Sequence, residues 1–231
     1  MPVILICTLL FIVWLHYESK KSSKYSANKS EEFWRREQEA NFTRKKDLSK
    51  LDYITVPLKN LPFSKNCSEE ILKFQEKVEE LAGKRILNLT GMTNTDLKAE
   101  YGVANFNEVS EYDTNYMELI TSLNSWGLLL FNDEKYDDAE TVFKYAISCG
   151  SDIKATYITL GSIYAVRHET DKIDELIHLA ENNIEAFTKN SVITSLKNLK
   201  SNYMLSEKPD SDIDFEKLGF NENAGSDNSD L

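Results

Sequence analysis

Cysteine and histidine are scarce in this chain, and their scarcity excludes several kinds of site. The three cysteines are Cys7, Cys67 and Cys149, and no two of them have the spacing of a CxxC pair. The sequence therefore predicts neither a disulfide framework nor a cysteine-based metal or redox centre. A reducing compartment fits this usage. The three histidines, His16, His168 and His178, are far apart and form no HExxH motif.

Motifs that carry enzymatic chemistry are absent as well. The chain contains no P-loop, no GxGxxG, and no serine or cysteine in a nucleophile motif. Its densest carboxylate cluster lacks the Asp-x-Asp-x-Asp-Gly spacing of an EF-hand, so these residues are expected in turns and helix caps. The cluster is Asp133, Glu134, Asp137 and Asp138. We therefore expect a non-enzymatic protein, with no catalytic residue, metal, cofactor or small-molecule substrate.

Basic residues are concentrated near the N-terminus, although the chain as a whole is acidic. The net charge is -11, but residues 18–50 carry ten Lys/Arg against six Asp/Glu. Residues 51–231 therefore have a balance of -15. An acidic body argues against nucleic acid, whose recognition needs clustered Lys and Arg. A basic collar beside an apolar segment favours a membrane surface.

The one long apolar run is the segment Pro2–Leu15, PVILICTLLFIVWL. It has neither the basic n-region nor the cleavage site of a signal peptide, and Ile6 before Cys7 does not fit a lipobox. About 20 residues span a bilayer comfortably, and snorkelling lysines can offset a shorter segment. We predict a transmembrane anchor at residues 1–17 that contacts lipid; a buried core helix is the alternative. The expected interface residues are Trp14, Tyr17, Lys20, Lys21 and Lys24.

The charges on either side of this segment predict its orientation. No charged side chain precedes it, whereas lysines and arginines follow it closely. The positive-inside rule then places the N-terminus outside and the body in the cytoplasm of a single-pass membrane protein. Four Asn-x-Ser/Thr sequons would matter only in a eukaryotic secretory lumen.

Residues 18–63 carry three different patterns. Residues 18–30 are rich in Ser, Lys and Asn without periodicity, which predicts a basic linker. Residues 31–63 combine an amphipathic helix with the strip LDYITVPLKNLPF, in which two prolines exclude a helix. The helix could rest on anionic lipid, or its aromatic residues could dock on the body. The strip is expected to lie across helices and to bury Tyr53, Ile54, Leu58, Leu61 and Phe63.

The rest of the chain predicts helices followed by an acidic tail. Residues 64–110 are expected to form an N-terminal helical cover, with a Ser68-capped helix to about Asn88 and a short helix ending at Tyr101. Helices are then expected at residues 114–131, 136–148, 152–167, 170–187 and 189–205. The fold class is therefore all-α. Residues 207–231 carry too few apolar residues to order, apart from Ile213–Phe220, which either folds on a partner or is inert.

A repeat of 34 residues organises the second half of the chain. Gly127 recurs as Gly161, Ala146 as Ala180, Phe143 as Ile177 and Leu130 as Tyr164. Trp126-Gly127, Ala139 and Phe143 in the first unit, and Leu160-Gly161 and Tyr164 in the second, resemble the tetratricopeptide (TPR) pattern. This resemblance implies an antiparallel helix-hairpin solenoid over residues 111–206. Its repeats lie at about 120–153 and 154–187, with a capping helix at 188–206.

The TPR resemblance also implies a groove lined by the first helix of each repeat. Carried over by position, the lining and candidate protein-binding residues are Thr121, Asn124, Leu128, Phe131, Asn132, Ile158, Ser162 and Ala165, together with Ala155. No lysine stands near Asn124 and Leu128, where some TPR proteins clamp a C-terminal carboxylate. The groove is either open to an unknown protein partner or filled by residues 51–110.

Residues 33–205 also resemble uncharacterised membrane-anchored helical proteins of clostridia and related Firmicutes. The segments that carry this likeness are Leu51–Pro57 (LDYITVP), Ile86–Asp96 (ILNLTGMTNTD) and Glu111-Tyr112-Asp113. The resemblance implies a bacterial cytoplasmic membrane and no particular activity.

Two functions fit these patterns. The first is a membrane-anchored scaffold or adaptor whose TPR-like body faces the cytoplasm and recruits a protein. The second is a structural subunit of an envelope or secretion assembly, held by contacts between transmembrane segments; for this function a body outside the cytoplasm is an open alternative.

Overall fold

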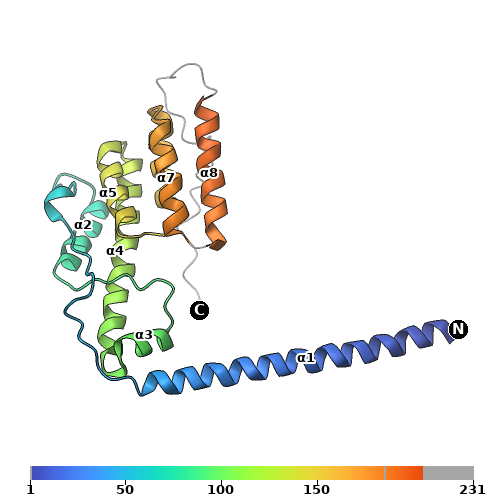
Figure 1. The fold of residues 1–231 in the computed structure, drawn as a ribbon. Helices are drawn as coiled ribbons and strands as arrows, with labels where there is room; N and C mark the ends of the chain where they lie inside the picture. Colours follow the sequence, from blue (N-terminus) through green and yellow to red (C-terminus); the bar gives the residue numbers. More distant parts are fainter. Residues whose placement is uncertain (1, 185, 205–231) are drawn as a thin grey trace. The chain divides into compact units, whose positions relative to one another are not determined.

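The computed structural model describes residues 2–184 and 186–204, and within these ranges it contains helices and no strand. The all-α prediction is therefore confirmed. The α-helices are α1 (Pro2–Asn41), α2 (Glu69–Ala82), α3 (Asn94–Tyr101), α4 (Phe106–Asn132), α5 (Tyr136–Ser148), α6 (Lys154–Val166), α7 (Thr170–Asn183) and α8 (Ala186–Met204). Two 3-10 helices, η1 (Leu58–Asn60) and η2 (Val103–Asn105), lie between them (Figure 1). The acidic tail predicted at residues 207–231 lies outside the described residues.

The chain divides into two compact units. Among the described residues, unit 1 consists of the chain up to Ile54 together with Lys84–Tyr116. Unit 2 consists of Thr55–Gly83 together with the chain from Met117 onward. The expected helical cover at residues 64–110 is therefore shared between the two units. Helix α4 contributes its first part to unit 1 and the rest to unit 2.

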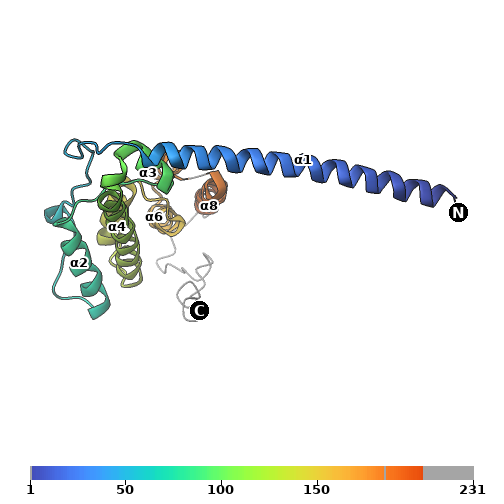
Figure 2. The ribbon, with the colours of Figure 1, turned by 90° about the horizontal axis from the view of Figure 1, so that it is seen from below.

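Unit 1 begins with α1, a single uninterrupted helix where the sequence suggested an anchor, a linker and a second helix (Figures 1 and 2). No glycine or proline occurs from Val3 to Val56, so no residue of the predicted linker breaks the helix. Among the residues that the structure describes, no helix is both long enough and apolar enough to cross a membrane. The predicted transmembrane anchor at residues 1–17 is not supported, because the apolar run ends at Leu15 whereas the helix continues with polar residues.

The C-terminal end of α1 packs on α3. Helix α3 begins with a capping box in which the side chains of Thr93 and Asp96 each accept a hydrogen bond from the other's backbone N–H. Arg36 of α1 lies 2.7 Å from the Asp96 carboxylate, and Glu37 accepts hydrogen bonds from Lys98 and Thr95. The apolar core of unit 1 is formed by Leu48, Leu87, Leu89, Leu97, Val109 and Tyr112.

Aromatic side chains near the end of α1 do not dock on the described body. Phe33, Trp34 and Phe42 are all exposed, and Phe42 reaches 87%. The strip after α1 contains no α-helix, as its prolines predicted, and its one regular element is the short 3-10 helix η1. Its expected burial is only partly correct. Leu61 is buried and Tyr53, Ile54 and Phe63 are partly buried, but Leu58 is 37% exposed.

Unit 2 contains α2, the greater part of α4, and α5 to α8. Ser68 caps α2 by accepting a hydrogen bond from the Ile71 N–H, and Gly83 ends the helix earlier than the predicted Asn88. The ring of Phe63 lies 5.0 Å from that of Trp126, and Lys77 of α2 pairs with Glu118 at 2.8 Å. Residues 55–83 therefore cover one side of α4.

The residue pairs that defined the 34-residue repeat are buried at equivalent places. Both members of every pair, from Gly127 and Gly161 to Leu130 and Tyr164, lie in the core of unit 2. A Cβ atom on Gly127 would lie 2.5 Å from the Phe143 ring, and one on Gly161 would lie 2.5 Å from Leu196 of α8. Glycine thus allows the helices to approach closely at both sites, and α8 packs on α6.

Candidate functional site

Five of the eight predicted groove residues reach the surface of unit 2. Thr121 and Asn132 of α4 are exposed, and Asn124, Leu128 and Ile158 are partly buried. The Asn124 carboxamide accepts a hydrogen bond of 3.0 Å from Thr156, which ties α4 to α6. Phe63, in the segment of residues 55–83, packs on Trp126, and Thr121 and Asn132 stay exposed.

The remaining three predicted groove residues are buried and cannot line an open groove. Phe131 packs edge-on against Tyr136, with ring centroids 5.5 Å apart. Ser162 and Ala165 lie in α6, which contacts α5, α7 and α8 and is buried almost all round. Burial keeps these three side chains out of an open groove in this structure; at Ser162 and Ala165 the helices packed on α6 cover them. The binding role of the predicted groove residues stays a prediction.

The predicted interface residues lie on an exposed part of α1. Trp14, Tyr17, Lys20 and Lys21 are all exposed, and the side chain of Lys24 lies outside the described residues. The apolar side chains described before them are exposed too, each by 47% or more; they are Ile4, Ile6, Leu10, Phe11, Ile12, Val13 and Leu15. A helix that is apolar on all sides is normally covered by lipid or protein.

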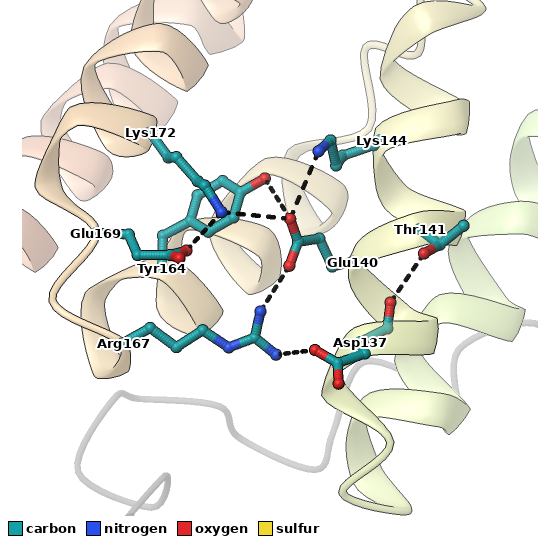
Figure 3. Close-up of polar contacts among 8 residues, drawn as sticks. All are labelled: Asp137, Glu140, Thr141, Lys144, Tyr164, Arg167, Glu169 and Lys172. Carbon is teal, nitrogen blue, oxygen red and sulfur yellow. Dashed lines mark hydrogen bonds and ion pairs between the residues drawn. The ribbon is translucent and has the colours of Figure 1, made fainter.

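A polar network that the sequence did not reveal joins α5 to α6 and α7. Its centre is Glu140 of α5, whose side chain is 13% exposed. One carboxylate oxygen accepts a hydrogen bond of 2.6 Å from Arg167 and the other accepts one of 3.3 Å from the Tyr164 hydroxyl (Figure 3). Lys144 and Lys172 also approach this carboxylate, at 3.5 and 3.8 Å.

Further charges surround the network. Arg167 also pairs with Asp137 at 2.7 Å, and Lys172 pairs with Glu169 at 2.8 Å. The hydrogen bond to Glu169 raises the pKa of Lys172. Burial, and then the nearby charge of Glu140, raises the pKa of Tyr164. Lys172 and Tyr164 thus stay protonated near neutral pH. The network links the two repeats electrostatically.

An apolar cavity adjoins this network. Its volume is about 230 Å³, and it lies between α5 and α7 over α6. The lining residues are Lys144, Ile147, Ser148, Leu160, Tyr164, Lys172, Glu175, Leu176 and Leu179. Ile147, Leu160 and Leu176 are buried, whereas Leu179 is 45% exposed at the edge. The arrangement can receive apolar side chains, with lysine ammonium groups beside them.

A second, larger cavity of unit 2 lies between η1 and α2. Its volume is about 660 Å³, and it is lined by Leu58, Phe63, Ser64, Lys65, Leu72, Gln75, Glu76 and Glu79. Neither cavity shows a constellation for covalent or metal chemistry. Among the described residues, no group of three His, Cys, Asp or Glu side chains could hold a metal ion. Burial raises the pKa of the Cys149 thiol, which disfavours its nucleophilic thiolate.

Comparison with known proteins gave no relative: no family model, curated protein or solved structure matches the chain.

Proposed function

We propose that this protein is a non-enzymatic, membrane-attached scaffold or adaptor that holds a helical protein-interaction body at a membrane. The observation that carries the proposal is the exposure of the described apolar side chains at the start of α1, a helix that continues without a break to the end that packs on α3.

The exposed end of α1 suits a lipid environment. Its apolar side chains point in every direction around the helix, and Trp14 and Tyr17 stand where the apolar run meets the lysines. Indole and phenol rings favour the headgroup region, and lysines next to it favour anionic lipid. We therefore propose that residues 1–17 insert into a bilayer. The predicted topology, with the N-terminus outside and the body in the cytoplasm, remains part of this proposal.

The other end of α1 is fixed to unit 1. Glu37 accepts hydrogen bonds from Lys98 and from Thr95, the latter at 2.5 Å, and Arg36 pairs with Asp96. Hydrogen bonds from Lys98 and Thr95 lower the pKa of Glu37, which keeps it ionised near neutral pH. Because α1 is one helix, its proposed membrane-binding end and its docked end belong to the same element.

The interaction role is proposed for the repeat body of unit 2. Equivalent residues at a spacing of 34 are buried in both hairpins, as a TPR-like solenoid requires. Thr121, Asn132 and the half-buried Leu128 present a small, partly apolar face on α4. Such faces in helical repeats bind peptide segments or partner helices.

Vesicle flotation tests the membrane part. In Leu10→Asp/Val13→Asp, two exposed apolar residues of α1 become charged; Phe33→Asp/Trp34→Asp makes the same change near the docked end. We expect the wild type and the Phe33/Trp34 variant to float with vesicles containing anionic phospholipid, and the Leu10/Val13 variant to remain in solution. Flotation of the Leu10/Val13 variant at the wild-type level would disprove attachment through this segment.

The alternative function, a structural subunit of an envelope or secretion assembly, rests on the same exposed helix. An apolar helix can pair with other membrane helices as readily as with lipid. Crosslinking in intact cells with mass spectrometry, on the wild type and on the Leu10/Val13 variant, separates the two functions. A scaffold retains its soluble partners in the Leu10/Val13 variant, whereas an assembly subunit loses all of its partners. A reporter fused to Leu231 that is active only outside the cytoplasm tests the topology.

A further inference from the structure

The larger cavity of unit 2, between η1 and α2, is a groove with an exposed rim. Its volume is about 660 Å³. Phe63 and Leu72 are partly buried in it, Leu58 is 37% exposed, and the exposed lining residues are Ser64, Lys65, Glu76 and Glu79. An occupant therefore buries one side on the apolar residues and keeps its other side in water. A peptide laid in a groove does this, whereas a drug-sized ligand typically buries about 70–90% of its surface.

One face of α2 forms a wall of this groove. Its lining residues are three or four positions apart, which places them together on one side of the helix; they are Leu72, Gln75, Glu76 and Glu79. From the first to the last of them, the helix rises by roughly 10 Å, or about two turns. This length is enough for two bulky apolar side chains of a peptide, one at each turn.

Gln75 is a buried polar side chain of the groove lining. The residue is only 5% exposed, and its carboxamide oxygen accepts a hydrogen bond of 3.2 Å from the Ser64 N–H. This bond fixes the orientation of the carboxamide. Its nitrogen carries two N–H donors and is paired, within the described part of the chain, only with the Cys67 sulfur at 3.8 Å. Because sulfur is a weak acceptor, the carboxamide can still donate a hydrogen bond to a peptide carbonyl.

The two carboxylates of the groove have no cationic partner. In the described part of the chain, no ion pair involves Glu76 or Glu79, and Lys77 of the same helix pairs with Glu118 at 2.8 Å. Lys65 is the one cation of the lining, so the lining residues have a balance of -1, from one Lys and two Glu. The groove therefore favours an occupant that carries basic side chains beside its apolar ones.

We propose that the groove between η1 and α2 binds a basic, amphipathic peptide segment of a partner protein. Apolar side chains of the segment pack on Phe63 and Leu72, and the Gln75 carboxamide donates a hydrogen bond to one of its carbonyl oxygens. Its Lys or Arg side chains pair with Glu76 and Glu79 at the rim. No residue of α1 or of the α4 face lines this groove, so its binding and the proposed membrane attachment can fail separately.

Fluorescence anisotropy with two synthetic peptides tests the binding. The probe is a labelled leucine–lysine peptide with helical periodicity, and its control is a copy in which glutamate replaces every lysine. Both are titrated with the full chain in zwitterionic micelles, and micelles without protein give the background. We expect the basic peptide to bind and the acidic peptide not to bind. Equal binding of the two peptides, or no binding of the basic one above background, would overturn the proposal.

Charge reversal at the rim shows whether the groove is responsible. Glu76→Lys/Glu79→Lys should raise the Kd of the basic peptide about tenfold, because two attractive contacts become repulsive. Glu134→Lys/Glu181→Lys changes the net charge equally at exposed residues of unit 2 outside the lining, and should match the wild type. Equal weakening in both variants would assign the binding to overall charge and overturn the proposal. Vesicle flotation of the Glu76/Glu79 variant should match the wild type, which separates this groove from membrane attachment.

A photo-crosslinker and one apolar substitution locate the bound peptide. Benzoylphenylalanine in place of one leucine of the basic peptide should crosslink to residues 58–79, as mass spectrometry of the digested chain would show. Leu58→Ser should weaken binding several-fold, whereas Met117→Ser, at a residue of unit 2 that is 54% exposed and outside the lining, should not. Circular dichroism confirms that each variant is folded. Crosslinks only to other parts of the chain would overturn the proposal.

Discussion

Glu134 and His168, which are 34 residues apart, adopt the same left-handed backbone conformation, with φ of 60° and 56°. Each ends the first helix of a repeat with the same hydrogen bonds. In the first turn, the Glu134 N–H donates to the Phe131 carbonyl oxygen and the Lys135 N–H to the Leu130 carbonyl oxygen. In the second turn, the His168 N–H donates to the Ala165 carbonyl oxygen and the Glu169 N–H to the Tyr164 carbonyl oxygen. This is a Schellman turn, whose left-handed position usually carries glycine.

Glycine at these two turns should therefore stabilise unit 2. Both side chains are exposed, so Glu134→Gly and His168→Gly relieve backbone strain without removing packing. We expect a gain of about 0.5–1 kcal/mol each, after allowing for the larger entropy of the unfolded glycine chain. Urea unfolding followed by circular dichroism measures the change. Lys197→Gly, on the exposed side of α8, is the matched control and should cost about 0.5–1 kcal/mol. A loss of stability at both turns would contradict the proposed strain.

The close approach of α4 and α5 gives a second prediction. The Phe143 ring is fully buried and cannot move away from a new Cβ atom on residue 127, 2.5 Å from it. Gly127→Ala should therefore lower the free energy of unfolding by about 1–3 kcal/mol, as overpacking usually does. The same urea titration measures the loss.

Two other glycines serve as controls for this prediction. Gly161→Ala meets the end of the flexible Leu196 side chain and should cost less than Gly127→Ala. Gly83→Ala meets only the Glu80 carbonyl oxygen, at an ordinary 3.6 Å, and should be nearly neutral. Equal losses at positions 83 and 127 would show that packing against Phe143 is not the cause.

The repeat could be predicted from the sequence because it depends on local pattern. Small residues at Gly127, Ala146 and their equivalents mark close helix contacts, and the regular spacing of large residues marks the buried face. Boundaries that depend on tertiary contacts were less predictable. The sequence predicted a helix from residue 114, yet α4 begins at Phe106, because Val109, Tyr112 and Tyr116 already form a buried helical face.

Apolar runs outside the repeat were ambiguous for a similar reason. Ile86 and Leu87 suggested the end of a helix, but they follow Gly83 in extended backbone. The Ile86 carbonyl oxygen accepts a hydrogen bond from the Ile54 N–H, and the Leu87 N–H donates one to the Tyr112 carbonyl oxygen. These partners are distant in sequence, so propensity alone does not reveal them.

The candidate site was the least predictable part of the molecule. Glu140 and Arg167 are 27 residues apart, and each alone has the pattern of an ordinary surface charge. Only the packing of α5 beside α6 and α7 brings them together. Conversely, the burial of Ser162 and Ala165 depends on how α8 lies against α6, which a resemblance confined to two repeats does not specify.

The Glu140 network should contribute to the stability of the two-repeat body. Glu140→Gln leaves Arg167, Lys144 and Lys172 without the carboxylate that they share. We expect the free energy of unfolding to fall by about 1–2 kcal/mol. This value lies between those for exposed ion pairs and for charged hydrogen bonds in partly buried sites. Asp137→Asn removes a 93% exposed carboxylate that contacts the same Arg167 and should cost less than about 0.5 kcal/mol. If the two substitutions lower the free energy of unfolding equally, the Glu140 network contributes no more to stability than an exposed surface charge does.

The contact between α1 and α3 should depend on pH. Hydrogen bonds from Lys98 and Thr95 lower the pKa of Glu37 below its ordinary 4.5, and those from Thr93 together with Arg36 lower the pKa of Asp96 below its ordinary 3.8. The folded state therefore binds fewer protons than the unfolded state in this range. The stabilisation is fully present above about pH 5 and is lost as the pH falls through the lowered pKa values.

Variants at these two carboxyl groups separate their contribution from that of other acids. The Glu37→Gln/Asp96→Asn protein should have a lower urea midpoint than the wild type at pH 7, and the difference should shrink between pH 5 and pH 3. Glu31→Gln/Glu32→Gln neutralises two exposed acids on the same helix and should leave the wild-type pH profile nearly unchanged. If the difference in urea midpoint between the wild type and the Glu37→Gln/Asp96→Asn protein stays constant from pH 7 to pH 3, the charges of Glu37 and Asp96 do not stabilise the contact with α3. In that case, the geometry of the side chains, which the amide variants largely preserve, would have to account for the docking of α1.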